Sequence, residues 1–307
     1  MKRTQIMPDP GLLPETVQQL IADATIYDSS CSTEATVWFI DKDGGFYLKS
    51  APAGSLKAEA EMTRFFHSKD LSVEVLAYES ADRDYFVTRA AIGEDCIHPQ
   101  HLYDPKQLSE KLGILLRRLH EVDPSGCPVT DRTSAFITAT ANNHQLGKWH
   151  SSRLAEGMRH YSAEEAWHVV QEFSGVLKTD TLIHGDYCLP NIMLDNWKFS
   201  GFIDLDTGGV GDRHVDLFWG TWSLNYNLKT DKFCTRFLDA YGRDKIDEEN
   251  IAEKWNPSGV ENKTTNGFYF STKETVLRWL IRGNTFYDVI IPEDAEIILC
   301  DEEKGIY

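Results

Sequence analysis

The sequence predicts an α+β protein of two lobes, a small N-terminal lobe built on a β-sheet and a larger lobe that is mostly helical. A chain of 307 residues is long enough to form two lobes with separate hydrophobic cores. Short apolar runs separated by turn signals gather in the first part of the chain, and apolar stripes at helical spacing dominate the middle. We therefore expect three parts: a β lobe over residues 1–91, a helical lobe over 92–254 and an extension over 255–307.

The first lobe is expected to contain a helix, a hairpin, a second helix and two further strands, over residues 14–24, 36–49, 56–67, 73–77 and 85–88. The hairpin is predicted because its two apolar runs flank a turn that is rich in Asp and Gly. Alternation along its second strand places Tyr47 and Lys49 on one face.

The helical lobe is expected to contain helices over residues 105–119, 163–177, 216–225 and 232–241. The first has a leucine stripe that is typical of a core-facing helix, and Gly113 within it predicts close packing. Ser162 and Glu165 form a capping-box pattern at the start of the second. Residues 131–156 show no clear pattern. In the extension, a strand, a helix and a strand are expected over residues 268–270, 274–281 and 290–300.

The most informative segment contains three short apolar runs, over residues 181–183, 192–194 and 199–203, which predict strands. The loop after the first run holds Asp186 and Asn191, and Asp204 follows the last run. Phosphoryl transfer needs this set of groups. One carboxylate positions the attacking hydroxyl and receives its proton, while an amide oxygen and a second carboxylate hold magnesium on the nucleotide phosphates.

An eight-residue motif in this segment resembles that of the aminoglycoside 3′-phosphotransferases, which are kinase-like antibiotic phosphotransferases; it reads His184-Gly185-Asp186-Tyr187-Cys188-Leu189-Pro190-Asn191. Residues 201–205 and 209–216 fit the same family, and the looser resemblance extends over about residues 25–250. It implies a protein-kinase-like two-lobed fold with ATP or GTP and Mg²⁺ between the lobes. It also implies phosphorylation of the 3′-hydroxyl of an aminoglycoside antibiotic, and thus antibiotic resistance.

The resemblance implies a role for each residue of the motif set. Asp186 is expected to orient the acceptor hydroxyl and take its proton, and Asn191 and Asp204 are expected to hold Mg²⁺. Lys49 is expected to hold the phosphates, oriented by Glu59 on the following helix. His184 is expected to fix the loop, and Asp216 to brace it through backbone hydrogen bonds.

The resemblance also implies further contacts to the nucleotide and the acceptor. The expected nucleotide contacts are Tyr47 against adenine, Ser32 and Thr33 in the loop over the phosphates, and the backbone of Arg89 and Ala91 at the hinge between the lobes. Glu61 is the alternative partner for Lys49. On the acceptor side, only Glu156 is acidic between residues 151 and 157, where the family builds part of its antibiotic site.

The chain departs from the family pattern after Asp204. Asp206 and Thr207 stand where the family usually has Gly-Arg, so one phosphate contact is lost and one carboxylate is added. That carboxylate could help to hold magnesium or face solvent. The extension from residue 255 also differs from the acidic helix that usually ends members of the family.

Composition restricts the partners. The formal net charge of −17 argues against a nucleic acid and suits a small polycationic antibiotic, although acidity for solubility alone would give the same charge. No long apolar run or N-terminal signal core is present, so we expect a cytoplasmic protein without a membrane partner. The cysteines lack metal-ligand spacing and are expected to be reduced. A monomer or weak dimer is expected.

Two alternative functions remain open from the residues. The first is a kinase of another small alcohol, such as a macrolide, choline or a sugar, which would share the nucleotide chemistry and differ in the acceptor pocket. The second is a catalytically silent, kinase-like binding module that uses the extension as a partner site. The presence of Lys49, Asp186, Asn191 and Asp204 argues against the second alternative.

Overall fold

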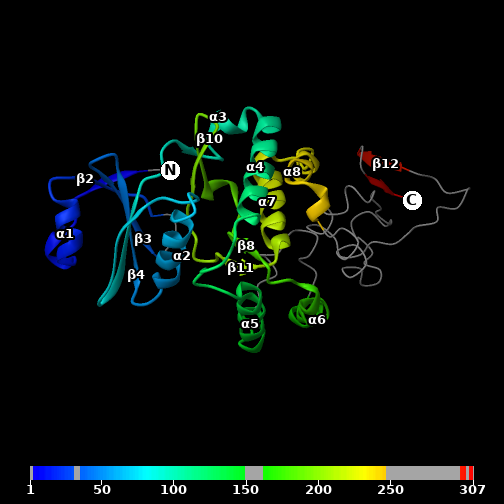
Figure 1. The fold of residues 1–307 in the computed structure, drawn as a ribbon, viewed down its shortest axis with the longest axis horizontal. Helices are drawn as coiled ribbons and strands as arrows, with labels where there is room; N and C mark the ends of the chain where they lie inside the picture. Colours follow the sequence, from blue (N-terminus) through cyan, green and yellow to red (C-terminus); the bar gives the residue numbers. More distant parts are fainter. Residues whose placement is uncertain (1–2, 31–34, 149–161, 247–297, 302–303, 307) are drawn as a thin grey trace, which may run out of the picture. The chain divides into compact units, whose positions relative to one another are not determined.

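The computed structural model describes residues 3–30, 35–148, 162–246, 298–301 and 304–306 (Figure 1). Contacts within the chain define two compact units. The first unit comprises Met1–Asp104, Arg118–Arg132 and Asp180–Trp219, and the second comprises Pro105–Arg117, Thr133–Thr179 and Gly220–Tyr307. The first unit contains most of the strands and the second most of the helices, so the chain is α+β. The predicted divisions at residues 91 and 254 stay predictions.

The first unit contains a six-stranded sheet in the order β1-β2-β3-β4-β6-β5, in which all neighbouring strands are antiparallel. Its strands are β1 (Thr4–Ile6), β2 (Thr25–Asp28), β3 (Thr36–Asp41), β4 (Phe46–Pro52), β5 (Val75–Ser80) and β6 (Arg83–Arg89). The predicted hairpin is confirmed as β3 and β4. Strands β1 and β2 were not predicted, because three or four residues are too few to show an alternation.

Two helices cover opposite faces of this sheet (Figure 1). Helix α1 (Glu15–Ile21) packs Val17 and Ile21 against Phe46 and Leu48 of β4. Helix α2 (Lys57–His67) packs Ala60 against Ala51 and Phe86 on the other face. Because side chains alternate along β4, Tyr47 and Lys49 share the face of α2, as predicted.

Buried Asp84 fixes the entrance to α2. Its carboxylate accepts hydrogen bonds from the backbone N–H groups of Gly54 and Leu56, each at 2.8 Å, and from the hydroxyls of Tyr78 and Ser80. Burial acts to raise the pKa of Asp84, but these hydrogen bonds outweigh it and lower the pKa. The start of α2, and with it the placement of Glu59, is therefore tied to the sheet.

The remaining strands of the first unit form two small sheets. Strand β8 (Thr181–Ile183) pairs with β11 (Gly209–Gly211), and β9 (Ile192–Asp195) pairs with both β10 (Lys198–Phe202) and β7 (Glu94–Asp95). The turn between β9 and β10 has positive φ at Asn196 (48°) and Trp197 (66°), as a two-residue type I′ hairpin requires. Strands β8, β9 and β10 were predicted from their apolar runs, whereas β7 and β11 were not.

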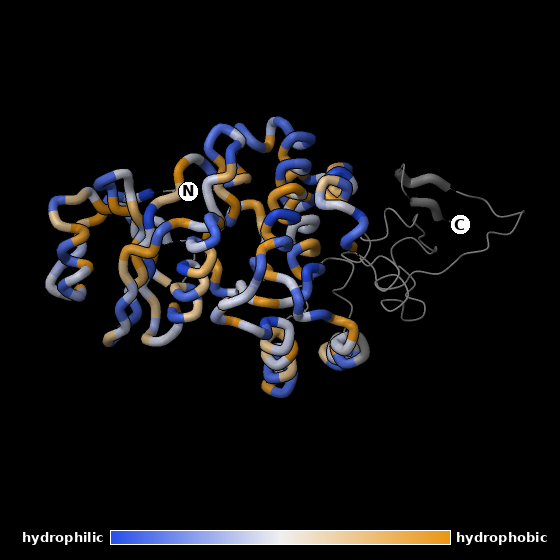
Figure 2. The backbone as a smooth tube through the Cα atoms, in the orientation of Figure 1, coloured by the Kyte–Doolittle hydropathy of each residue, from blue (hydrophilic) through white to orange (hydrophobic). Residues whose placement is uncertain are grey.

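The main helices outside the first 104 residues are α4 (Pro105–His120), α5 (Arg132–Gln145), α6 (Ala163–Phe173), α7 (Arg213–Leu228) and α8 (Cys234–Tyr241). A short helix, α3 (Pro99–Leu102), precedes them. Along the helices in Figure 2, hydrophobic and hydrophilic segments alternate, as amphipathic helices require. The leucine stripe of α4 is buried, as predicted. The capping box is confirmed too, since the Ser162 and Glu165 side chains each accept from the other residue's backbone N–H.

Helix α5 was missed, because its residues alternate small and polar types without an apolar stripe. Helix α6 ends before the predicted position and continues as a 3₁₀ turn over Ser174–Val176. Among the residues expected in the extension, 268–270 and 274–281 lie outside those described, and β12 (Ile298–Asp301) pairs with β13 (Lys304–Ile306). No helix in the described part of the chain has the length and apolar character needed to cross a bilayer.

Candidate functional site

The loop between β8 and β9 holds Asp186 and Asn191 in direct contact. The side-chain amide of Asn191 donates to the Asp186 carboxylate at 2.9 Å and to the Asp186 carbonyl at 3.0 Å. Asn191 is buried and Asp186 is half-buried. Because the amide nitrogen is directed at Asp186, the amide oxygen of Asn191 is the atom left to act as a ligand.

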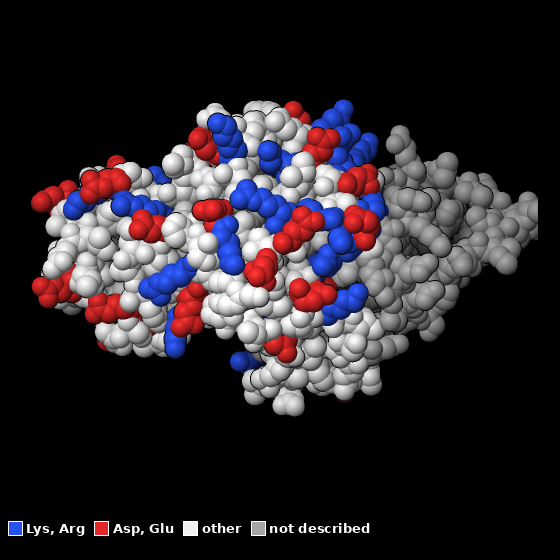
Figure 3. All heavy atoms as spheres, in the orientation of Figure 1, with Lys and Arg blue, Asp and Glu red and all other residues white. Residues whose placement is uncertain are grey.

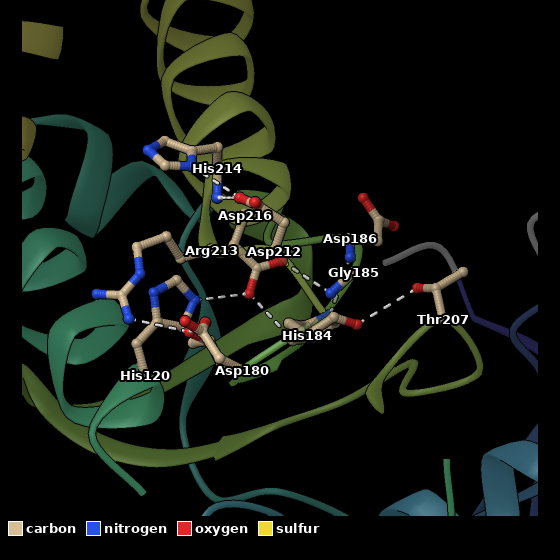
Figure 4. Close-up of polar contacts among 11 residues, drawn as sticks. His120, Asp180, His184, Gly185, Asp186, Thr207, Asp212, Arg213, His214 and Asp216 are labelled. Atoms are coloured by element: carbon tan, nitrogen blue, oxygen red, sulfur yellow. Dashed lines mark hydrogen bonds and ion pairs between the residues drawn. The ribbon is translucent and has the colours of Figure 1, made fainter. Parts of the chain in front are cut away.

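A buried network beneath this loop fixes its backbone (Figure 4). The Asp216 carboxylate, in the first turn of α7, accepts from the backbone N–H groups of His184 and Gly185, each at 2.7 Å. Its oxygen also lies 3.1 Å from Nε2 of His120. Burial lowers the pKa of His120, so the imidazole is neutral and donates to Asp216. Figure 4 shows Asp186 on the side of Gly185 away from Asp216, so Asp216 holds the backbone of the loop from the side opposite to the Asp186 carboxylate.

His184 links this loop to the strand end that precedes Asp204. Its Nε2 lies 3.0 Å from the carbonyl of Ile203, and the Ile203 N–H donates to the carbonyl of Asn191 at 3.1 Å. These two bonds bring the loop of Asp186 and the residue before Asp204 together. The loop-fixing role expected of His184 is confirmed.

Lys49, Glu59 and Asp204 meet in the first unit. The Lys49 ammonium lies 2.8 and 3.0 Å from the two carboxylate oxygens of Glu59 and 3.3 Å from Asp204. Glu61, the alternative partner, instead lies 3.9 Å from Lys57 at the surface. The structure therefore selects Glu59, which is buried, as the partner of Lys49.

Burial and charge shift the pKa values of this pair. Burial raises the pKa of Glu59 to about 7, although the charge of Lys49 opposes the rise. Burial also acts to lower the pKa of Lys49, but the charges of Glu59 and Asp204 outweigh it and raise the pKa. Lys49 is thus a permanent cation in the site, able to bind a phosphate group.

Asp204 lies two residues after the end of β10 and has a left-handed backbone, at φ 56°, and its side chain is exposed. Asp206 is exposed as well, and its charge acts on Glu59 and Arg132. In the described part of the chain, no group of three or more His, Cys, Asp or Glu side chains is arranged to hold a metal. If Asn191 and Asp204 are the ligands, they would supply two oxygen atoms to a metal ion. That number fits Mg²⁺, which keeps waters and binds substrate phosphates in addition to a few protein oxygens.

The other residues in the expected nucleotide site are placed as follows. The rings of Tyr47 and Phe39 lie 5.2 Å apart between centroids, and Arg3 donates to the Tyr47 hydroxyl at 3.0 Å. The Arg89 guanidinium binds the Asp43 carbonyl and lies 3.5 Å from Glu74. Ala91 is half-buried. Ser32, Thr33 and Glu156 lie outside the described residues.

Three residues in the middle of the eight-residue motif lie in the interior of the protein. Tyr187, Cys188 and Leu189 are buried, and the Tyr187 ring packs edge-on against His184 and Phe202. Burial raises the pKa of the Tyr187 hydroxyl well above its usual range. These three residues therefore support the loop from below and present no side chain to a substrate.

Two arginines that contact the site were not predicted. Arg3 covers the Phe39 ring at 3.5 Å, and Arg132 donates to the backbone of the segment after Asp204. Neither belongs to a motif. Arg132 reaches carbonyl oxygens 74 and 76 residues along the chain, and a bond to a carbonyl leaves no signature in residue types.

Comparison with known proteins gives consistent results. The model of the phosphotransferase enzyme family matches residues 28–253. A probable aminoglycoside 3′-phosphotransferase of Lactococcus lactis is 45% identical over 242 residues, which span 78% of this chain and 91% of the relative. An aminoglycoside 3′-phosphotransferase of Niallia circulans is 29% identical over 210 residues, 67% of this chain and 79% of the relative.

Solved structures confirm the predicted fold class, α+β and kinase-like. An aminoglycoside phosphotransferase of Streptomyces rimosus matches with a TM-score of 0.60 and 25% identity, covering 70% of this chain and 87% of its own. The same enzyme has been solved in complex with ADP and streptomycin. An aminoglycoside 3′-phosphotransferase of type VIII matches with a TM-score of 0.60 and 20% identity, covering 91% of this chain and 92% of its own.

Proposed function

Since the chain belongs to the phosphotransferase enzyme family and is an enzyme that transfers phosphoryl groups, we propose that it moves the γ-phosphoryl group of ATP to the 3′-hydroxyl of an aminoglycoside antibiotic. The observation that carries this proposal is the assembly of four predicted groups in the first unit. Asn191 lies 2.9 Å from Asp186, and Lys49 lies 3.3 Å from Asp204. Separate elements of the sequence supply these groups.

Each group has one task in the proposed reaction. The acceptor oxygen attacks the γ-phosphorus, its proton passes to the Asp186 carboxylate, and ADP leaves. Asn191 and Asp204 would hold Mg²⁺, whose charge offsets that of the phosphates. Lys49 binds the phosphates and Glu59 keeps it in place. Most of the rate then comes from positioning and charge neutralisation.

Further residues are proposed to contact the nucleotide and the acceptor. Tyr47 shares the sheet face of Lys49, which suits a ring that stacks on adenine. Ser32, Thr33, the backbone of Arg89 and Ala91, and Glu156 keep their expected roles. The backbone N–H of Arg89 already donates to the Glu74 carbonyl, so its carbonyl and the Ala91 amide are the groups proposed to meet the base.

A polycationic antibiotic is the substrate class that the charge favours. The net charge of −17 attracts cations, but acidic and basic side chains are interspersed on the face seen in Figure 3. Long-range attraction therefore raises the encounter rate, and specific acidic contacts must orient the antibiotic. We also propose that the protein acts in the cytoplasm, where its buried thiols, among them Cys96 and Cys127, stay reduced.

The test is ADP release with Mg-ATP and four antibiotics. Kanamycin and neomycin carry the 3′-hydroxyl, whereas tobramycin and gentamicin lack it. The first pair should be turned over and the second should not, because charge attraction alone does not distinguish one hydroxyl. The Asp186→Asn variant serves as the background control.

Three other results would change the assignment. Equal turnover of all four compounds would remove the 3′ assignment. Turnover of none, with turnover of a macrolide, choline or a sugar, would favour a kinase of another alcohol. Nucleotide binding without any acceptor-dependent turnover would favour a silent binding module.

A further inference from the structure

Arg132, at the start of α5, makes an unusual set of contacts to the segment after Asp204. Its Nε and one terminal nitrogen both donate to the carbonyl of Gly208, at 2.9 and 2.6 Å. The same terminal nitrogen donates to the carbonyl of Asp206 at 3.0 Å. All these acceptors are backbone atoms, so the contacts constrain the path of the chain between residues 204 and 209, which we call the Asp204 loop.

The Asp204 loop has little internal support. It begins with the left-handed backbone of Asp204, and one internal backbone hydrogen bond, from Gly208 N–H to the Leu205 carbonyl, is found within it. Its far end is held by the N–H of Val210, which donates to the Val129 carbonyl at 2.8 Å. Residues 129–132 therefore hold the loop at two points, once through the backbone of Val129 and once through the side chain of Arg132.

The loop also rests directly on the backbone that carries Asp186. Gly185 has φ 82°, and a Cβ atom added to it would lie 2.1 Å from the Thr207 carbonyl oxygen. The Thr207 hydroxyl donates to the His184 carbonyl at 3.4 Å (Figure 4). A shift of the Asp204 loop would therefore change the distance between Asp204 and the pair of Asp186 and Asn191.

We propose that Arg132 is a positioning residue that clamps the Asp204 loop against the loop of Asp186 and so sets the spacing of the two magnesium-binding groups, Asn191 and Asp204. The magnesium role rests on the proposed function, whereas the clamp itself does not. Arginine suits this role because its planar guanidinium presents several donors at fixed angles, and lysine presents a single ammonium. Arg132 acts through the backbone and does not itself touch the reacting atoms.

The test compares Arg132→Ala and Arg132→Lys with a matched control, Arg117→Ala. Arg117 also donates to a backbone carbonyl, that of Tyr241 at 3.1 Å, and pairs with Asp244 at 3.2 Å. Both substitutions to alanine remove a partly buried guanidinium and its bond to the backbone. Only the Arg132 substitution should affect the Asp204 loop.

The first readout is amide hydrogen exchange of peptides over residues 203–210 in the protein without nucleotide or metal. Arg132→Ala should accelerate exchange there by about tenfold or more, because local opening loses its side-chain restraint. Arg132→Lys should show a smaller acceleration. Exchange in this segment that matches the Arg117→Ala control would overturn the clamp, and this result does not depend on the reaction catalysed.

The second readout is calorimetric binding of ADP with Mg²⁺ and with EDTA. Arg132→Ala should weaken Mg-ADP binding by about 10- to 100-fold, the usual effect of losing a group that orients a metal ligand, and leave ADP in EDTA nearly unchanged. An equal loss under both conditions would overturn the positioning role. If Arg132→Ala fails to fold, Arg132→Lys, which keeps the stem and charge, decides both readouts. If the wild-type protein shows no acceptor-dependent ADP release, the proposed function is contradicted. The hydrogen-exchange result still decides whether Arg132 clamps the Asp204 loop.

Discussion

The Lys49 ammonium lies 2.8 Å from one carboxylate oxygen of Glu59 and 3.0 Å from the other, so a single buried acid holds it from below. Because burial raises the pKa of Glu59 to about 7, the ion pair between Glu59 and Lys49 depends on pH near neutrality. As the pH falls below that value, Glu59 takes up a proton and the ion pair is lost. We predict that kcat/KM for ATP falls on this acidic side.

The Glu59→Gln variant checks that prediction. It should lower kcat/KM for ATP by about tenfold at pH 8, since a charged hydrogen bond is replaced by a neutral one. It should also abolish the decline of kcat/KM at acidic pH. If kcat/KM for ATP still declines at acidic pH in Glu59→Gln, the decline belongs to the titration of another group.

The stability of the protein should also depend on Glu59. Because the folded-state pKa of Glu59 is raised from 4.5, its contribution to stability is full below that value and is lost as the pH rises through about 7. The urea midpoint of the wild type should therefore fall relative to Glu59→Gln over this range.

Replacing Asp186 by asparagine should remove most of kcat and leave nucleotide binding intact. The amide keeps the shape of the side chain and its contact with Asn191, but it cannot accept the proton of the acceptor hydroxyl. We expect a loss of kcat of about 100-fold or more, with the Kd for ADP changed by less than about threefold. Steady-state kinetics and calorimetry measure the two quantities. Unchanged kcat would remove Asp186 from its proposed role.

Asp204→Ala should abolish turnover through loss of the metal, and Asp206→Ala is its matched control. Both carboxylates are exposed on the same loop, but only Asp204 lies against Lys49. We expect Asp204→Ala to bind Mg-ADP no more tightly than it binds ADP in EDTA, because water does not replace the missing carboxylate ligand. Asp206→Ala should keep the preference for Mg-ADP. Equal losses in the two variants would show that Asp206 shares the metal.

Gly113→Ala should destabilise the second unit without changing the chemistry. A Cβ atom at Gly113 would lie 2.3 Å from the Phe237 carbonyl and 2.8 Å from the Ala240 Cβ, so α4 and α8 would have to separate. Overpacking of this kind costs about 1–3 kcal/mol, which exceeds the gain of about 1 kcal/mol from the better helix propensity of alanine. The urea unfolding midpoint should fall.

The control for this substitution is Gly175→Ala. No atom lies within 4 Å of a Cβ added there, and the residue is exposed. Its unfolding midpoint should stay within error of the wild type or rise slightly. A similar midpoint in both variants would mean that α4 and α8 adjust to the extra methyl group without cost.

Some parts of the site were predictable because the physics behind them is local. Alternation along β4 put Tyr47 and Lys49 on one face, and the turn residue Asn196 carried the left-handed backbone that its hairpin requires. The capping box of α6 lies within four consecutive residues. By contrast, α5 lacks an apolar stripe, and β7 and β11 contain only two and three residues, so their partners define them.

By itself the sequence determined which chemical groups are present and the local turns that carry them, because side-chain type and short spacing are properties of neighbouring residues. Tertiary structure decided which groups meet. It placed Glu59 and not Glu61 on Lys49, and it brought Arg132 to carbonyls 74 and 76 residues away. Such choices depend on helix orientation and on backbone acceptors, which every residue has. They therefore arise only when the chain has folded and burial makes one pairing more favourable than the others.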